Sequence, residues 1–405
     1  MMSRQGVTMT VQPDIAPLAM CHSTNVDYAL PLDRAKSISG LVSGEALAGE
    51  RLGRLTDKVA TAMLDANLFS IRLPHSDGGL AGTGVELFEA TEEIARADGS
   101  AGWCMLISNA VGTFVHIGAD PKARCEIFGH GPVACWATLL PKAKSVEVEG
   151  GFRVSGNFAW GSSSSLSRWV MVAGSIADRD GEQWFRAHLV PKEDVEIKEG
   201  SWDVMGLRAT ASVDYTISDR FVPTHRTFEY PFLSDGDPRH ASARGLVELG
   251  RPGMAAFASG IGLRALDELL AAAPKTKRLQ SEGMQSEDNV VQFGIGELEG
   301  RLRAARGYCL DLVAEQDRAL ARGHMLDPSR TLDMLQAFHT LTRAARDMTV
   351  FAFDQAGTSV VYATSPLQRC LRDIFTGLKH GIVTPAILGR IGKVRLGLEY
   401  GEVRL

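Results

Sequence analysis

The chain has 405 residues, of which 45% are hydrophobic and 22% charged, close to the average for folded globular proteins. Lys and Arg number 43 and Asp and Glu 48, so the formal net charge is -5. This composition argues against a disordered chain, and the lack of a cationic excess argues against nucleic acid as a partner. A chain of this length is expected to form two or three structural units.

The cysteines and the N-terminal segment predict a cytoplasmic protein. The six cysteines include no C-x-x-C pair, as expected of reduced thiols in a reducing compartment. The N-terminus lacks the basic segment and apolar run of a secretory signal, and no window approaches the 18 apolar residues of a membrane span. We therefore expect no membrane partner, and a mobile arm at residues 1–35.

Residues 36–131 are predicted to form an N-terminal helical domain. The stretch 44–69 is rich in Ala, Leu, Glu and Arg and predicts a helix. A glycine-rich turn follows, and then a second helix around VELFEATEEIARA. Residues 99–118 predict a third helix, which is apolar on nearly all sides and is therefore expected to be buried.

Residues 132–235 are predicted to form a central β domain, because short β-prone runs alternate there with turns such as EGG and GSSSS. The run 183–190 does not alternate strictly, so a bulge is allowed for in that strand. Residues 236–405 are predicted to form a four-helix bundle that includes an antiparallel helix pair. Its apolar seams are Val291, Ile295, Leu298, Leu302, Ala305, Cys309 and Leu312 on one helix, and Met334, Phe338, Leu341, Ala345, Met348 and Ala352 on the next.

Common cofactor motifs are missing from the sequence. Neither GTGVEL nor GIGELEG follows a predicted strand with the three glycines of a dinucleotide loop. No His or Cys pair has metal-ligand spacing, and therefore no metal site is expected.

Three segments carry a resemblance to a known superfamily. The first is LPHSDGGLAGTGVELFEATEEIARADGSAGW. The second is RVSGNFAWGSSSSLSRW with WDVMGLRATASVDYTISDRFVP, and the third is FDQAGTSVVYATSPLQRCLRDIFTGLKH. In this order they resemble the acyl-CoA dehydrogenase-fold flavoproteins, and the third resembles the P-L-Q-R-x-x-R-D-x-x-x-x-x-x-H signature of the two-component flavin-dependent (group D) monooxygenases. The resemblance implies an α+β fold: an N-terminal helical domain, a central β domain and a C-terminal four-helix bundle.

The resemblance assigns catalytic roles to His380, Ser162 and Ser163. His380 stands in a segment, IFTGLKHGIVTPA, that lacks the carboxylate used by the dehydrogenases, and an imidazole can exchange a proton near neutral pH. Ser162 matches the serine that lies against flavin N5, and Ser163 replaces a glycine and could share or take that role. The alternative is that His380 is a structural residue at a helix end, with its ring hydrogen-bonded to the backbone.

The resemblance also implies cofactor-binding residues. Trp160 and Ser162 are expected against the flavin ring, although Trp160 could equally be an ordinary core residue. Arg278 matches an arginine that meets the flavin phosphate of a neighbouring subunit, with a solvated basic cluster as the alternative. Gln355 and Gly357 match a nucleotide-contacting turn.

The predicted substrate pocket comprises Asn109, Trp136 and Trp103. Phenol-binding relatives often have a histidine near the position of Asn109, and this chain has none. A larger, more neutral aromatic or heteroaromatic substrate is therefore expected, although each of the three residues is also a candidate core residue.

The expected protein is the oxygenase component of a two-component monooxygenase, which hydroxylates an aromatic or heteroaromatic small molecule through a C4a-hydroperoxyflavin. Its cofactor would be reduced FMN or FAD, which a separate NAD(P)H:flavin reductase would supply. O2 would be the co-substrate. A homotetramer is implied by the family. The alternatives are an FAD-dependent acyl-CoA dehydrogenase or oxidase, an N-oxygenase of an amino group, and a flavin-free scaffold.

Overall fold

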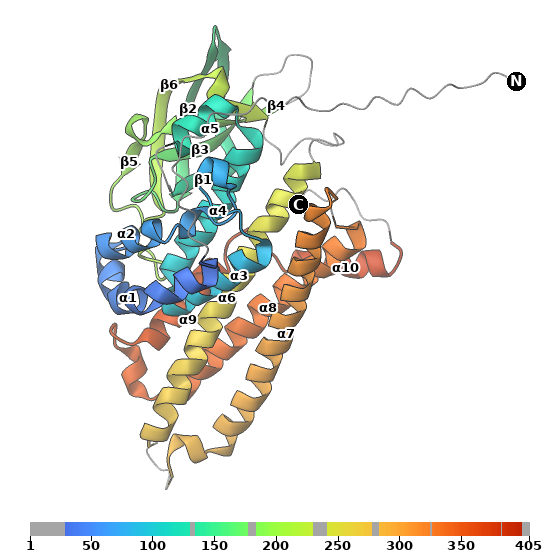
Figure 1. The fold of residues 1–405 in the computed structure, drawn as a ribbon. Coiled ribbons are helices and arrows are strands. Elements are labelled where there is room, and N and C mark those ends of the chain that lie inside the picture. The colour runs from blue at the N-terminus through green and yellow to red at the C-terminus, as the bar shows by residue number, and fades with distance from the viewer. Residues whose placement is uncertain are drawn as a thin grey trace, which may run out of the picture.

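The computed structural model describes residues 29–129, 134–176, 184–229, 241–277, 283–324, 326–381 and 383–398. Most of the arm predicted for residues 1–35 lies outside these ranges, and residues 31–35 already belong to a helix. The order of helices, strands and helices follows the expected α+β fold (Figure 1). The domain boundaries at 36, 132 and 236 stay predictions.

The described residues before the sheet form the helices α1 Pro31–Leu52, α2 Asp57–Asp65, α3 Gly84–Ala97, α4 Gly99–Gly118 and α5 Pro121–Phe128. The prediction of a single helix over 44–69 is wrong, because the helix is interrupted between the end of α1 at Leu52 and the start of α2 at Asp57. Gly53 ends α1 with a φ of 71°, a left-handed conformation that glycine adopts without strain, and Thr56 caps α2.

Helix α4 is the buried helix that the sequence predicts. Asp98 ends α3 and caps α4 by accepting a hydrogen bond from the Ala101 amide. Among the described residues, α4 alone is long and apolar enough to cross a membrane, but 72% of its apolar window is buried inside the protein. It packs against α3, α6 and α9 and against the first strand of the sheet, as expected of a core helix.

The sheet has seven strands in the order β5-β6-β2-β1-β3-β4-β7, and Figure 1 shows it at one end of the molecule. The strands β1 and β3 pair in parallel, and the other neighbours are antiparallel. The bulge allowed for in β4 is not found, since its register with β3 is unbroken. An irregularity occurs instead near the end of β2, between Phe158 and Gly161. The strands are β1 Cys135–Val148, β2 Gly151–Gly161, β3 Trp169–Ile176, β4 Trp184–Pro191, β5 Glu196–Lys198, β6 Val213–Pro223 and β7 Thr227–Glu229.

The helices after the sheet are α6 Ala241–Ala272, α7 Asn289–Ala321, α8 Pro328–Gln355, α9 Pro366–Gly377 and α10 Ala386–Arg395. Both predicted seams are confirmed: they pack into one apolar core with α6 and α9. Asp327 caps α8 through the Ser329 amide. The bundle thus packs α6 against α3 and α4, and α9 against α4 (Figure 1).

Candidate active site

The turn after β2 has an unusual backbone. Trp160 and Ser163 both have positive φ values, 67° and 68°, which are sterically unfavourable for residues other than glycine. The Ser162 amide donates to the Trp160 carbonyl oxygen, so the strand ends in a tight turn rather than continuing. Such strained positions persist only where surrounding contacts enforce them, and they concentrate at functional sites.

Ser162 lies at the junction of the sheet with α4. The indole Nε1 of Trp103 donates to Ser162 Oγ at 3.1 Å, and the Ser212 hydroxyl lies 2.7 Å from the same oxygen. Ser163 is fully buried, and its hydroxyl donates to the Cys104 carbonyl oxygen at 3.4 Å. The two predicted serines therefore point to different partners, and Ser162 is the one that contacts Trp103.

His380 reaches the same place from the end of α9. Its ring lies 5.8 Å from the Trp103 ring, centroid to centroid, at 68° between planes. Phe257 of α6 contacts another edge of Trp103 at 5.3 Å. Gly377 permits this approach, since a Cβ there would lie 2.4 Å from the Phe257 ring and 3.2 Å from the Trp103 ring. Trp103 therefore connects Ser162 with His380.

Burial sets the protonation state of His380. Desolvation lowers the pKa of this imidazole below its ordinary value of 6.5. The ring is consequently neutral near pH 7, with one nitrogen able to accept a proton and the other able to donate one.

Trp160 is 64% exposed although it stands two residues before the buried Ser162. A large aromatic side chain left uncovered beside a buried hydroxyl and an indole fits a planar, polar-edged ring such as a flavin isoalloxazine. The residues present are therefore compatible with the flavin that the sequence implies.

Asn109 and Trp136 are not part of this group. The Asn109 amide donates to the carbonyl oxygens of Leu68 and Met105 at 2.8 and 2.9 Å, so it ties α4 to a neighbouring turn. Trp136 is 1% exposed and stacks on Tyr215 with 5.1 Å between centroids. Both side chains are used in the core, and of the predicted pocket residues only Trp103 contacts Ser162.

Gln355 and Gly357 lie where α8 ends, beside the connection from α6 to α7. The side-chain amide of Gln285 donates to the Gln355 carbonyl oxygen, and a Cβ at Gly357 would lie 3.8 Å from the Thr276 side chain. Arg278, the third residue predicted to bind the cofactor away from the ring, lies outside the described residues. Gln355 and Gly357 thus form a second group, distinct from Ser162 and Trp103.

Sequence reasoning missed Thr210 and Ser212. Their hydroxyl oxygens lie 2.6 Å apart, and Ser212 continues the contact to Ser162. Both are buried, with exposed fractions of 1% and 2%. The signal was present in the G-L-R-x-T-x-S motif, in which two hydroxyl residues recur at a spacing of two.

The loop that carries these hydroxyls is fixed by α9. The Leu207 amide donates to Asp373 Oδ1 at 2.6 Å, and a Cβ at Gly206 would lie 2.2 Å from the Arg372 carbonyl oxygen. Burial, with the nearby Asp98 carboxylate, raises the pKa of Asp373 to about 7. Asp98 itself pairs with Arg369 at 3.8 Å.

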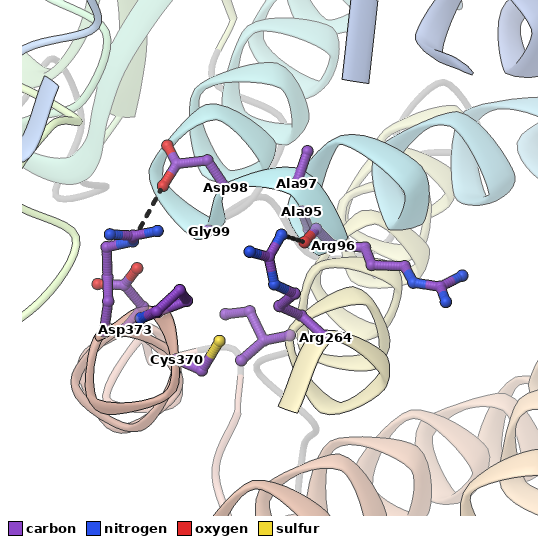
Figure 2. Close-up of a pocket in the computed structure, with 11 residues that line it drawn as sticks. Ala95, Arg96, Ala97, Asp98, Gly99, Arg264, Cys370 and Asp373 are labelled. Atoms are coloured by element: carbon purple, nitrogen blue, oxygen red, sulfur yellow. Dashed lines mark hydrogen bonds and ion pairs between the residues drawn. The ribbon is translucent and has the colours of Figure 1, made fainter. Parts of the chain in front are cut away.

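Asp98 and Asp373 lie on one side of a small pocket, with Arg264 across from them (Figure 2). Among the described residues no group of three His, Cys, Asp or Glu side chains could hold a metal ion. Asp98 caps a helix and Asp373 holds a loop amide, so both carboxyls have structural partners.

Comparisons with known proteins identify similar sequences. Residues 253–385 match the family model "Acyl-CoA dehydrogenase, C-terminal domain". The chain is 28% identical over 389 residues to a pigment production hydroxylase of Rhodococcus erythropolis, covering 89% of this chain and 96% of that protein. It is 27% identical over 370 residues to the flavin-dependent monooxygenase oxygenase subunit HsaA of Mycobacterium tuberculosis, covering 85% of this chain and 89% of that one.

Solved structures share the fold over nearly the whole chain. The 3-HSA hydroxylase of Rhodococcus sp. RHA1 superposes with a TM-score of 0.83 at 23% identity, covering 94% of this chain and all of that one. XiaF of Streptomyces, solved with FADH2 and glycerol, gives 0.82 at 21% identity, covering 93% and 97%. The chain therefore has the acyl-CoA dehydrogenase-like fold, and its sequence is similar to those of flavin-dependent monooxygenase oxygenase subunits.

Proposed function

We propose that this protein hydroxylates an aromatic or heteroaromatic small molecule with O2 and reduced FMN or FAD. The flavin would be reduced by a separate NAD(P)H:flavin reductase in the cytoplasm, and the reaction would need no metal. The observation that carries the proposal is the convergence of Ser162 and His380 on Trp103.

Each residue of the candidate site is assigned a separate role. Reduced flavin, when bound, supplies the electrons that activate O2. Ser162 would hold the N5 edge of the ring through its hydroxyl, and Trp160 would cover the ring. Trp103 donates a hydrogen bond to Ser162, and its ring contacts the His380 ring edge-on.

His380 would handle the substrate proton. A neutral imidazole can take the proton of a phenol or indole as oxygen is transferred, which an imidazolium cannot do. Trp103 and Phe257 surround this end of the site with apolar surface, so water is kept from the reacting atoms.

The second group supports assembly of the site from more than one subunit. Arg278, Gln355 and Gly357 would bind the phosphate and nucleotide side of a flavin whose ring lies against Ser162 of another protomer. This arrangement requires an oligomer, and we propose a homotetramer.

An acyl-CoA dehydrogenase activity is the main rival. That reaction needs a carboxylate to remove an α-proton, and residues 374–386 contain none. Asp373, which precedes this segment, is occupied by the Leu207 amide.

Anaerobic titration with reduced FMN and reduced FAD, followed by mixing with O2 and a panel of phenols and indoles, tests the proposal. We expect tight binding of at least one reduced flavin and hydroxylated product with at least one substrate. No binding of either flavin would support the scaffold alternative, and desaturation of an acyl-CoA would support the dehydrogenase.

A further inference from the structure

Three hydroxyl groups form a continuous chain behind the candidate site. Thr210 Oγ1 lies 2.8 Å from the Leu207 carbonyl oxygen, Ser212 Oγ lies 2.6 Å from Thr210 Oγ1, and Ser162 Oγ lies 2.7 Å from Ser212 Oγ. Trp103 Nε1 closes the far end by donating to Ser162. All these groups are buried, so each contact must be matched by a proton.

Counting protons assigns a direction to this chain. A carbonyl oxygen only accepts, so the Thr210 proton points to Leu207. Thr210 then accepts from Ser212, because each hydroxyl has a single proton, and Ser212 accepts from Ser162 for the same reason. The Ser162 hydroxyl thus donates its proton to Ser212, and one lone pair of Ser162 Oγ accepts from the Trp103 indole N–H.

The only capacity that Ser162 then retains toward a ligand is one lone pair. We propose that Thr210 and Ser212 are positioning residues that make Ser162 a hydrogen-bond acceptor, and that the site thereby selects a flavin whose N5 carries a hydrogen. Reduced flavin has N5–H, whereas N5 of oxidised flavin is itself an acceptor. This inference rests on the proposed function, because it assumes that Ser162 meets flavin N5.

Leu207, whose carbonyl oxygen begins the chain, is held in place by further hydrogen bonds. The Leu207 carbonyl oxygen also accepts from the Trp202 indole at 2.9 Å and from the Thr210 amide at 3.1 Å. The Leu207 amide is held by Asp373 of α9. Leu207 is therefore held at both its amide and its carbonyl, and reversing the chain would require three hydroxyls to turn together.

The test measures the dissociation constants of oxidised and reduced flavin, and their ratio, by anaerobic titration with FMN and FAD. Ser212→Ala removes the acceptor of the Ser162 proton, so that this proton can point to the ligand. We expect the variant to bind oxidised flavin more tightly relative to reduced flavin. The ratio of the two dissociation constants should shift by up to about tenfold, the effect of one hydrogen bond. The midpoint potential of the bound flavin should shift in the matching direction.

Thr210→Val is the second variant, because it keeps the side-chain volume and leaves the Ser212–Ser162 contact. It frees the Ser212 proton to point to Ser162 and should shift the ratio in the same direction. Ser164→Ala is the matched control, since Ser164 is equally buried in the same turn but donates to the Ala211 carbonyl oxygen at 2.6 Å, outside the chain. Its ratio should equal that of the unaltered protein.

An unchanged ratio in both Ser212→Ala and Thr210→Val, with flavin still bound, would overturn this inference and leave the proposed function standing. An equal shift in Ser164→Ala would also overturn it, because the effect would then come from packing of the turn. Failure of the unaltered protein to bind either form of flavin would overturn the proposed function together with this inference.

Discussion

The α7–α8 pair and the turn after β2 are stabilised by different forces. The helix pair is held by apolar side chains such as Leu302 and Leu341, which are fully buried at regular spacing. The turn is held by hydroxyls that bond to carbonyl oxygens and to each other, on a backbone with positive φ at two residues. Apolar burial tolerates small shifts, whereas a chain of hydrogen bonds depends on each distance, so we expect stability to reside in the bundle and chemistry in the turn.

Of all the substitutions considered, His380→Ala should cause the largest loss of hydroxylation rate while the protein stays folded. His380→Ala should bind reduced flavin and consume O2, yet hydroxylate substrate about a hundred to ten thousand times more slowly, the usual span for one acid or base. H2O2 would become the main product, measured against hydroxylated product. His380→Asn should recover only part of the rate, because an amide cannot exchange a proton near neutral pH.

The pH profile sharpens the same point. Since burial lowers the pKa of His380, the acidic limb of the hydroxylation rate should lie below pH 6.5 in the unaltered protein. His380→Asn should lack this limb. Full coupling of O2 use to hydroxylation in His380→Ala would make the residue structural.

A substitution in the helical bundle should have the opposite effect: it should lower stability and leave the chemistry unchanged. Leu302→Ala should lower the free energy of unfolding by about 2–5 kcal/mol, because it leaves a cavity in a fully buried seam. Product yield per O2 consumed should stay the same in the folded fraction. Arg303→Ala, on the exposed face of the same helix, serves as the control in denaturant titrations and should change stability by less than about 0.5 kcal/mol. A loss of coupling in Leu302→Ala would show that the two regions are not independent.

Asp373 connects the regions, and its pKa makes a prediction about stability. Its folded-state pKa is about 7, above the unfolded value of 3.8, so the folded protein binds more protons between these values. The contribution of Asp373 to stability should therefore fall as the pH rises from 4 to 7. Asp373→Asn should flatten this dependence in thermal unfolding, and an equally steep profile in the variant would assign it to another group.

Ser162→Ala should have the smallest effect. One hydrogen bond of about 0.5–1.5 kcal/mol is lost, so H2O2 release should rise by up to roughly tenfold while the fold is kept. Ser163→Ala is the control, because its hydroxyl donates to the Cys104 carbonyl oxygen. The reverse result would place Ser163 against the flavin.

The contrast also explains what could be predicted from the sequence. The seams of α7 and α8 follow from local spacing, and the apolar composition of α4 predicted its burial. The break at Gly53 was missed because a single glycine outweighed the helix-forming residues around it. For Asn109 and Trp136 the sequence leaves pocket and core both open, and the partners that bury them in the structure come from distant segments.

The site itself was only partly predictable. Ser162, Trp103 and His380 are far apart in sequence. Motif resemblance indicates Ser162 and His380, and Trp103 is a candidate pocket residue, but nothing in the sequence indicates that Trp103 contacts the other two. Thr210 and Ser212 were overlooked because their role appears only when the loop folds back on the turn after β2. Hydrogen-bond direction depends on the complete set of neighbours, which spacing along the chain does not contain.

The most direct test of the central claim is the origin of the oxygen in the product. The purified protein, supplied with reduced flavin under 18O2, would be incubated with phenols, indoles and acyl-CoA thioesters, and the products analysed by mass spectrometry. The account predicts one 18O atom in a hydroxylated aromatic product. An unlabelled product, or a desaturated acyl-CoA with no hydroxylated aromatic, would contradict it.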